Sequence, residues 1–507
     1  MPDVSTAMKE KSVFEADAIV IGSGMGGVSA ACMMTKHGMR VIVLEAAYVP
    51  GGCSSSYKRK GYVFESGATT LVGFDEHQPM QTLERELGIE IKKTELNPSM
   101  IVHLDGREIV RHKDREAWIQ EAIKHFGNPE GQRSFWNQAF QVAETVWRVS
   151  GNNVFFPPKN ITDWMQLALV NHPKDAPTLR FAFTSVLDEM KKHGVATHEF
   201  IRFADEQLMI TAQAAAKDTP FIFGAAGLTY TNYSNYYVYG GLLNMVEQLR
   251  AWMQERGSEI KTRRKVVSVE KKGDESYLVK TENGEIYRAP IVVSNIPIWN
   301  LGELTDDEMK PWFEEKSKRY EQAWGAFTMG VVCEDTFDEE MPLHHQLHLP
   351  KNETMPLTGA GSVFVSMSAR GDIARAPEGL RTLNVSCHTD TAHWFTMNGE
   401  YEANKEKVQD FILAHLKKTL PGMADSEIKL AFSATPITWQ NWVYRKDGRV
   451  GGIPQNMSRS VIDWPPAETP FPGFFLCGDT IYPGQGIPGV TLGGINVYYR
   501  IEKYLKN

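Results

Sequence analysis

The feature that most constrains this chain is the stretch ADAIVIGSGMGGVSAACMMTKHGMRVIVLEA, at residues 16–46. Residues 18–21 predict a short buried parallel strand. Residues 28–37 predict a helix, and residues 40–44 predict a second buried strand. A strand, a glycine-rich turn, a helix and a second strand in this order predict a βαβ unit of a parallel sheet.

Three glycines of the turn have the spacing G-x-G-x-x-G, at Gly22, Gly24 and Gly27, and Glu45 ends the second strand 18 residues later. Gly22 permits the tight turn, Gly24 lets a pyrophosphate approach the backbone, and Gly27 lets helix and strand pack closely. The helix N-terminus adds the positive end of a dipole. Glu45 suits the two ribose hydroxyls of an adenosine and repels a 2′-phosphate, which disfavours NADP. The alternative is a glycine turn in an unrelated α/β domain.

The residues after Glu45 distinguish between NAD and FAD. Gly51 and Gly52 follow six and seven residues later, and GYVFESG then predicts a short strand that ends at Gly67. A typical NAD domain would continue with another helix and strand. The second glycine turn instead matches the extended fingerprint of two-dinucleotide-fold flavoproteins, in which this pair approaches the flavin. The prediction is a non-covalently bound FAD.

A second glycine-rich segment, FFLCGDTIYPGQGIPGVTLGG, lies almost at the end of the chain, at residues 474–494. Residues 474–476 predict a further strand of the same sheet, which ends at Gly478 and Asp479. The acid is placed to bind the ribitol or to face the pyrophosphate. A closing helix is predicted from about Val490, and its N-terminus, with Pro488 and Gly489, would stabilise negative charge on a reduced flavin. The alternative is an ordinary C-terminal turn and helix.

A third segment completes the predicted nucleotide fold. Residues 242–256 predict an amphipathic helix, residues 266–269 a strand, and residues 291–294 a buried strand. In flavoproteins of this group, Val266 would lie next to the adenine. A plain core valine is the alternative.

Together these motifs resemble the phytoene desaturase and carotenoid isomerase family of flavoproteins, which includes retinol saturase. The resemblance covers nearly the whole chain. Its more specific stretches are RHKDREAW (111–118), LHHQLHL (343–349), VSMSARGDIARAPEGLRTLNVSCHT (365–389), PITWQNWVYRKDGRVGGIPQ (436–455) and CGDTIYPGQGIPGV (477–490). The chain departs from the family pattern at Cys53, where relatives carry Arg or Ser, and at Glu65, where Asp is common.

The resemblance implies an enzyme in which FAD acts on carbon–carbon bonds of a long polyene isoprenoid. Desaturation, cis–trans isomerisation and saturation remain open. A flavin amine oxidase, a saturase for another unsaturated lipid and a non-catalytic flavoprotein escort are also compatible with the motifs. The sequence contains no unambiguous acid–base pair, so no catalytic residue is predicted.

The predicted fold class is α/β, with an interrupted, Rossmann-like FAD domain of the two-dinucleotide-binding type. Residues 12–80, 225–300 and 470–507 are assigned to this domain. Residues 81–111 and 301–469 are assigned to a mixed-sheet substrate domain, and residues 112–224 to a helical lobe.

Composition limits the partners of the protein. The chain has 507 residues, a net charge of −8 and no long basic run, so nucleic acid is not an expected partner. Its five cysteines form no C-x-x-C pair, which fits a reducing compartment. The N-terminus lacks the apolar segment of a signal peptide, and no window reaches 18 apolar residues. These features favour a cytoplasmic protein, with membrane contact only at the surface; the oligomeric state is left open.

Two groups of side chains could form further sites. His344, His345 and His348 lie in a predicted strand without a nearby carboxylate or cysteine, so structural or cavity-lining histidines are preferred to a metal site. Cys53 and Cys477 fall near the predicted flavin, where small buried residues are preferred to a redox pair. No metal is expected.

Residues 161–170 predict a short helix that is apolar nearly all round, with Asn160 as its N-cap. Such a helix is either buried within the helical lobe or lies in a lipid surface. Burial is the preferred interpretation of the helix itself, but a hydrophobic substrate must be drawn from a membrane, so contact with a lipid surface is the hypothesis to test. A peripheral membrane surface is therefore an expected partner.

Overall fold

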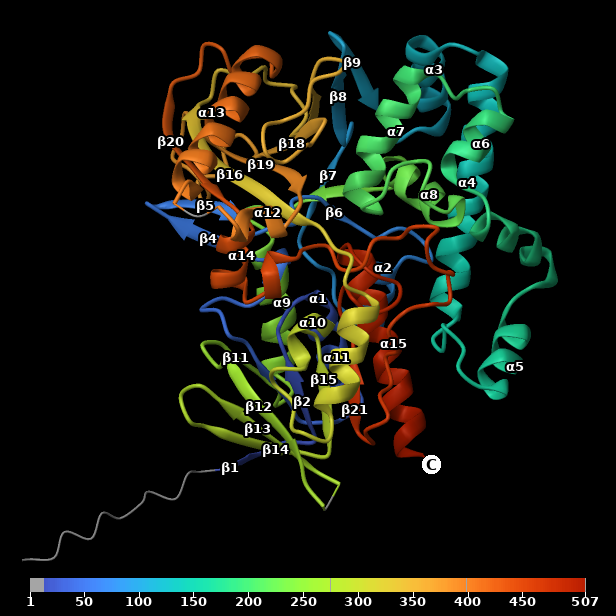
Figure 1. Ribbon diagram of the computed structural model, residues 1–507, viewed down its shortest axis with the longest axis vertical. Helices are drawn as coiled ribbons and strands as arrows, with labels where there is room; N and C mark the ends of the chain where they lie inside the picture. The colour runs from blue at the N-terminus through green and yellow to red at the C-terminus, as the bar shows by residue number, and fades with distance from the viewer. Residues whose placement is uncertain (1–12, 274, 398, 507) are drawn as a thin grey trace, which may run out of the picture.

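The computed structural model describes residues 13–273, 275–397 and 399–506. The N-terminal segment used in the signal-peptide prediction includes residues 1–12, which lie outside this range. The fold is mixed α/β with a five-stranded parallel sheet at one end and a seven-stranded mixed sheet at the other, as Figure 1 shows. The predicted fold class is confirmed.

The five-stranded sheet is built from segments far apart in the sequence. All of its strand pairs are parallel. In spatial order the strands are β11 (Glu259–Lys261), β3 (Val41–Leu44), β2 (Ala18–Ile21), β15 (Ile291–Ser294) and β21 (Phe474–Leu476). The residues of β2, β3, β15 and β21 are buried, because helices cover the sheet, and this explains their continuous apolar sequence.

The helices that pack around this sheet are α1 (Met25–Lys36), α2 (Pro79–Leu87), α9 (Leu243–Gln254) and α15 (Ile487–Leu505). Helix α1 begins three residues before the predicted start and contains Gly26 and Gly27. Helix α15 also begins three residues earlier than predicted, because Pro488 fits the first turn, where its missing N–H is not needed. The core here joins residues of α1, α9 and α15 to the sheet.

A four-stranded sheet lies beside the parallel sheet and contains β1 (Val13–Glu15), β14 (Ile286–Ala289), β13 (Tyr277–Thr281) and β12 (Val266–Lys271). Two short helices follow β15, α10 (Ile298–Leu301) and α11 (Lys310–Arg319). Smaller sheets connect the two ends of the molecule. They are β6 (Leu71–Val72) with β10 (Asn235–Tyr237) and β7 (Thr94–Leu96), and the hairpin β4 (Ser56–Arg59) with β5 (Tyr62–Glu65).

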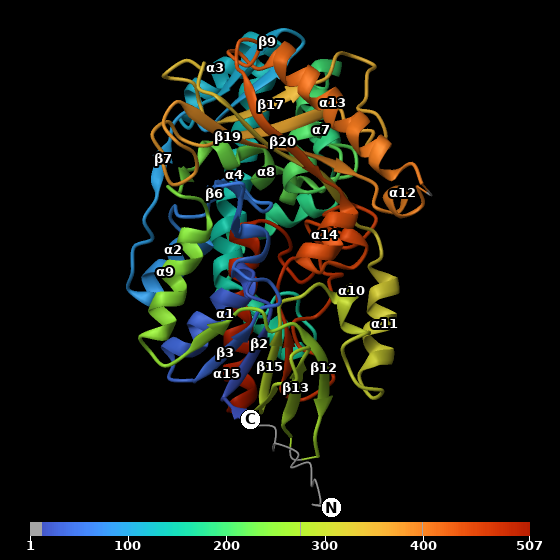
Figure 2. The ribbon, with the colours of Figure 1, turned by 90° about the vertical axis from the view of Figure 1, so that its left-hand side faces the viewer.

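The seven-stranded sheet forms the upper part of the molecule in Figure 1 and is seen from the side in Figure 2. In spatial order its strands are β20 (Ile428–Ala434), β16 (Gly325–Glu334), β19 (Leu380–Thr389), β18 (Ser362–Met367), β17 (His344–His348), β8 (Met100–Leu104) and β9 (Arg107–Arg111). Only the β17–β8 pair is parallel. The associated helices are α12 (Ala392–Phe395), α13 (Tyr401–Thr419) and α14 (Pro436–Val443).

The helical lobe lies at the right of Figure 1. It contains α3 (Arg115–Phe126), α4 (Pro129–Asn152), α5 (Ile161–Val170), α6 (Val186–Lys192), α7 (His198–Thr211) and α8 (Phe221–Thr229). Helix α8 packs on α4 and α7, whereas α2 packs on α15 and α1. The division into three domains remains a prediction, since α2 and α8 both cross its proposed boundaries.

Candidate active site

The two glycine turns that follow β2 and β3 lie against each other. Gly24 and Gly51 form a parallel β-bridge, and the amide of Gly51 donates to the Ser23 carbonyl oxygen at 3.1 Å. A Cβ atom on Gly52 would lie 3.3 Å from the Gly24 Cα, and both Gly51 and Gly52 have positive φ angles. Glycine is therefore needed at positions 51 and 52, because the two turns are in contact and the backbone has positive φ angles there. The spacing in the sequence did not show this contact between the two turns.

Asn295 explains why the first turn needs glycine, and the sequence analysis missed it. A Cβ on Gly24 would lie 2.7 Å from Asn295 Nδ2, and one on Gly26 would lie 2.6 Å from Asn295 Oδ1. A Cβ on Gly478 would likewise lie 3.0 Å from Asn295 Oδ1. Asn295 directly follows β15, so its place at the carboxyl end of a buried parallel strand was the signal that could have identified it.

Gly27 has a different position from the other glycines. It does not line the cavity described below, and a Cβ there would lie 2.3 Å from the Gly22 carbonyl oxygen. The glycine therefore sets the distance between α1 and the turn that follows β2.

The carboxylate of Glu45 ends β3 and already has three donors within the protein. Its Oε2 accepts from the Ser23 amide at 2.8 Å and the Ser23 hydroxyl at 2.6 Å. Its Oε1 accepts from the Ala47 amide at 2.8 Å. A carboxylate has about four acceptor positions, so one remains for a ligand hydroxyl. Glu45 lines the cavity while it also fixes the turn beside it.

The N-termini of α1 and α15 open into the same cavity. Their N-cap residues are Gly24 and Gly486, and no side chain caps either helix. Residues of both first turns line the cavity, including Gly26, Pro488, Gly489 and Val490. Uncapped amides and the positive ends of two helix dipoles converge here, which suits a ligand that carries negative charge at two places.

Asp479 lies at the carboxyl end of β21 and pairs with Arg445, a residue the sequence analysis did not single out. Arg445 Nη2 lies 2.7 Å from Asp479 Oδ2, and the two side chains are 10% and 16% exposed. Burial lowers the pKa of the Arg445 guanidinium, but Asp479 and the Cys53 thiol outweigh this and raise it. The positively charged Arg445 guanidinium thus lies between Asp479 and Cys53 at the cavity wall.

A cavity of about 1600 Å³ joins these elements. It is lined by Gly22, Gly24, Glu45, Gly51, Gly52, Val266, Gly478, Asp479, Pro488, Gly489 and Val490. Cavities that hold one small molecule measure about 300–1,000 Å³, so this one has room for a large cofactor and a second ligand.

Beyond the glycine turns, the cavity continues between the seven-stranded sheet and the helical lobe. The walls there are mainly apolar or aromatic, and they include Val146, Trp147, Ile210, Phe223, Ala226, Phe364, Phe432, Trp439 and Trp442. In the upper part of Figure 1, β18 and β20 lie to the left of α4, α7 and α8. The structure therefore brings together a polar half, at the nucleotide fold, and an apolar half.

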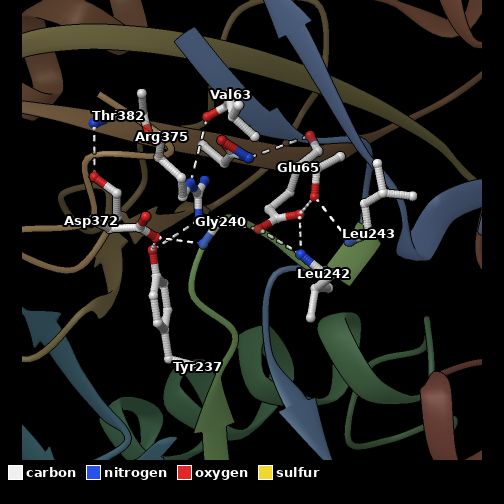
Figure 3. A network of polar contacts seen from close by, with 12 residues as sticks. Val63, Glu65, Tyr237, Gly240, Leu242, Leu243, Asp372, Arg375 and Thr382 are labelled. Carbon is white, nitrogen blue, oxygen red and sulfur yellow. Dashed lines mark hydrogen bonds and ion pairs between the residues drawn. The ribbon is translucent and has the colours of Figure 1, made fainter. Parts of the chain in front are cut away.

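A buried polar network fixes the hairpin β4–β5, which forms one wall of the cavity (Figure 3). Arg375 Nη1 lies 3.1 Å from Glu65 Oε1, and these side chains are 2% and 4% exposed. Glu65 also accepts from the Ser56 hydroxyl at 2.6 Å and from the Leu242 amide at 3.2 Å. Burial raises the pKa of Glu65, and Arg375, Ser56 and Leu242 oppose this shift.

The network continues from Arg375 to the loop before α9. The Tyr237 hydroxyl donates to Asp372 Oδ2 at 2.6 Å, and the Gly240 amide donates to the same oxygen at 2.8 Å. Asp372 and Arg375 belong to the stretch at residues 365–389, which is one of the stretches that carry the family resemblance. This stretch therefore ties the upper sheet to the wall of the cofactor half.

The three strand histidines do not reach the cavity. His345 Nδ1 lies 3.0 Å from His103 Nε2, and His345 Nε2 lies 2.8 Å from the Pro342 carbonyl oxygen. The His344 ring stacks on Phe364. Burial lowers the pKa of His344 to about 4 and that of His348 to about 3. Among the described residues, no three metal-ligating side chains are grouped at one place.

Comparison with known proteins supports a flavin-binding role for this cavity. The model of the family "Flavin containing amine oxidoreductase" matches residues 25–497, so the chain belongs to this family. The family match, the fold and the polar half of the cavity identify the protein as an FAD-dependent oxidoreductase, and FAD is its cofactor.

Individual proteins support the family resemblance that the sequence motifs indicate. The chain is 27% identical to prolycopene isomerase 2 of an Oncidium hybrid cultivar, over 98% of this chain and 85% of that protein. It is 22% identical to a neurosporene-forming phytoene desaturase of Cereibacter sphaeroides, over 97% of this chain and 94% of that protein. Wild-type putrescine oxidase bound to putrescine has a similar fold, with a TM-score of 0.64 at 13% identity, over 97% and 100% of the two chains. The resemblance to carotenoid isomerases and desaturases is confirmed.

We expect no tight nicotinamide site. Only the G-x-G-x-x-G at Gly22, Gly24 and Gly27 belongs to a βαβ unit, and the FAD site uses it; the second match, at Gly484, Gly486 and Gly489, lies at the start of α15, and no strand follows it in the described residues. Mixing the protein with NADH or NADPH in a stopped-flow instrument should give only slow flavin bleaching that does not saturate. Fast, saturable reduction would contradict this prediction.

Proposed function

We propose that this chain uses FAD to act on carbon–carbon bonds of a long polyene isoprenoid, by desaturation or cis–trans isomerisation. The observation that carries the proposal is the two-part cavity, whose polar half fits FAD and whose apolar half continues between the sheet and the helical lobe. A polyene has no charged group to bind, so an apolar channel beside a flavin suits it. The names of the isomerase and desaturase relatives indicate the same substrate class.

In this proposal, eleven residues that line the cavity hold the FAD, and Gly27 supports them by spacing α1 from the first glycine turn. Gly22, Gly24 and Gly27 form the pyrophosphate turn, and Glu45 binds the ribose. The others are Gly51, Gly52, Val266, Gly478, Asp479, Pro488, Gly489 and Val490. Bound FAD supplies hydride or electron transfer, and the protein positions the substrate and excludes water.

The test is to express the chain in bacteria that accumulate either phytoene or prolycopene and to separate the carotenoids by chromatography. Conversion of phytoene supports desaturation, and conversion of prolycopene to all-trans-lycopene supports isomerisation. Hydrogen peroxide released from amines, with both carotenoids unchanged, would instead support an amine oxidase and contradict the proposal.

The FAD is expected to be released completely by acid precipitation, because non-covalent contacts hold it. The supernatant should contain all the flavin, as measured by its absorbance and chromatography. Yellow colour retained in the washed pellet would show a covalent link. Free FAD mixed with the FAD-free protein and precipitated in the same way provides the control.

A membrane surface is proposed as the source of the substrate, and α5 as the contact. Among the helices of the described residues, none has the length and apolar character to cross a membrane. The buried alternative for α5 is wrong, because Ile161, Trp164 and Leu169 are 78%, 53% and 82% exposed. In Figure 1, α5 lies at the edge of the molecule.

Polar contacts attach α5 to the rest of the protein. Asn160 caps the helix as predicted, with its Oδ1 2.9 Å from the Asp163 amide. Asp163 is only 3% exposed, accepts from the Lys159 amide and pairs with Lys503 at 3.2 Å. The helix therefore turns its acid toward the protein and its apolar side chains outward, as expected for a helix that lies in a lipid surface.

We expect the double variant Trp164→Glu/Leu169→Glu to lose flotation with liposomes while it keeps its flavin spectrum. Burial of each apolar side chain in lipid contributes about 1.5–3 kcal/mol, which the glutamates remove. Leu167 is unsuitable for this test, because it is partly buried. The control is Val267→Glu/Ile373→Glu, which changes two exposed residues elsewhere and should float normally. Normal flotation of the α5 variant would exclude α5 as the contact.

A further inference from the structure

His388 lines the apolar half of the cavity, and the proposed function has not yet given it a role. It lies on β19 and lines the cavity together with neighbours from two other strands, β16 and β18. Ala326 of β16 pairs with His388, and Thr328 of β16 pairs with Ser386. Phe364 of β18 lies on the other side of Ser386.

Strand alternation separates this row from the other face of the sheet. Phe327 and Cys387, which pair with each other, belong to the core on the opposite side. Phe327 packs on Trp394, and the Cys387 thiol contacts Met355 Sδ at 3.6 Å. His388 is therefore the large polar member of a cavity-facing row that is otherwise small or apolar.

No hydrogen bond joins the His388 ring to another described residue, and the edge of Trp324 lies beside it with ring centroids 6.4 Å apart. Burial alone lowers the pKa of His388 to about 4, and no charged side chain contributes to the shift. The imidazole is neutral at pH 7 and keeps a free lone pair. His388 is half-buried and lines the cavity.

The other ionisable groups that line the cavity do not offer this chemistry. Burial raises the pKa of Tyr230 and Tyr57 to about 12, and the Cys387 thiol packs against Met355 in the core on the other face of the sheet. Of the four acids in the lining, Asp479 is paired with Arg445 and Glu45 accepts from Ser23, while Glu303 and Asp447 are paired with Lys446 and Arg449.

We propose that His388 is a catalytic residue that exchanges a proton with a carbon of the substrate. The proposal rests on the proposed function. In desaturation, one C–H bond breaks and its hydrogen leaves with both electrons, which reduces FAD. The neighbouring C–H bond breaks, its electron pair forms the new C=C bond, and its proton goes to the free imidazole nitrogen of His388.

The same exchange balances for isomerisation. The neutral imidazole of His388 would first take a proton from an allylic carbon, one C=C bond would rotate in the delocalised anion that is left, and the imidazolium formed in the first step would return the proton. No electrons are gained or lost overall. His388 thus serves either outcome of the proposed function.

The test compares the FAD-loaded wild-type protein with His388→Gln, using phytoene and prolycopene in liposomes as probes. Proton transfer by a positioned base contributes about 10²–10⁴-fold to a rate, so kcat should fall at least 100-fold. KM and FAD content should stay within twofold. His393→Gln is the control, because it makes the same change in an exposed histidine five residues away.

Two further measurements separate catalysis from structure. Added imidazole should restore part of the activity of His388→Ala, which a purely structural role would not allow. In ¹³C-histidine NMR spectra, His388 should stay neutral from about pH 5.5 to 8, as its low pKa requires.

A His388→Gln variant within threefold of wild-type kcat, or a charged His388 at neutral pH, would overturn the inference. Failure of the wild-type protein to convert either probe would instead overturn the proposed function. The two failures are therefore distinguishable.

Discussion

Replacing Arg375 with methionine is expected to destabilise the protein by about 3–5 kcal/mol, the usual cost of removing one partner of a buried ion pair. Arg375 and Glu65 are almost completely buried, and the charge of Glu65 would be left without its counter-ion. The backbone carbonyl oxygen of Arg375 also accepts from the Val63 amide, so the loop and β5 are held at two places. The loss should appear as a shift of the urea midpoint.

The control for this variant is Lys310→Met. Lys310 pairs with Glu314 one helical turn away, and both side chains are about half exposed, at 48% and 53%. Exposed pairs of this kind contribute well under about 1 kcal/mol. If Arg375→Met were no more destabilised than Lys310→Met, water would be reaching Glu65 and the network would not hold the hairpin.

A double variant, Glu65→Leu/Arg375→Met, should be less destabilised than the sum of its two single variants, because it leaves no unpaired charge. Ser56 and Leu242 would still lose their acceptor. FAD affinity should fall in the single variants as well, since the hairpin fixed by Glu65 forms a wall of the cavity. A network that acts on stability alone would leave FAD affinity unchanged.

Glu45→Ala is expected to weaken FAD binding by about 1.5–3 kcal/mol, the range for losing a charged hydrogen-bond partner. The ribose would lose its acceptor, and Ser23 and Ala47 would lose the carboxylate that holds their amides. The dissociation constant should therefore rise by about 10- to 150-fold, measured by fluorescence during titration of the FAD-free protein.

Glu259→Ala is the matched control for this experiment. Glu259 belongs to β11, the strand next to β3, and does not line the cavity. Its removal should leave FAD affinity within twofold of the wild type. Unchanged affinity in Glu45→Ala would rule out the ribose assignment.

The sequence by itself determined the fold class and the cofactor. Gly22, Gly24, Gly27 and Glu45 have a fixed spacing within one βαβ unit, so local geometry requires them in this order. The strands at residues 291–294 and 474–476 were also predicted with the observed bounds, because parallel strands buried on both faces need continuous apolar runs.

Contacts between distant segments were decided only by the tertiary structure. Asn295 against Gly24, Arg445 against Asp479 and Arg375 against Glu65 join residues more than 30 positions apart, and no periodicity encodes such pairs.

The exposure of α5 and the position of His388 were decided in the same way. The composition of α5 suits both a buried and a lipid-facing helix, and the ion pair of Asp163 with Lys503 selects the side that faces outward. Strand alternation shows that His388 and Cys387 face opposite ways. Only the packing of the seven-stranded sheet against the helical lobe and the nucleotide fold decides which of the two faces encloses the cavity.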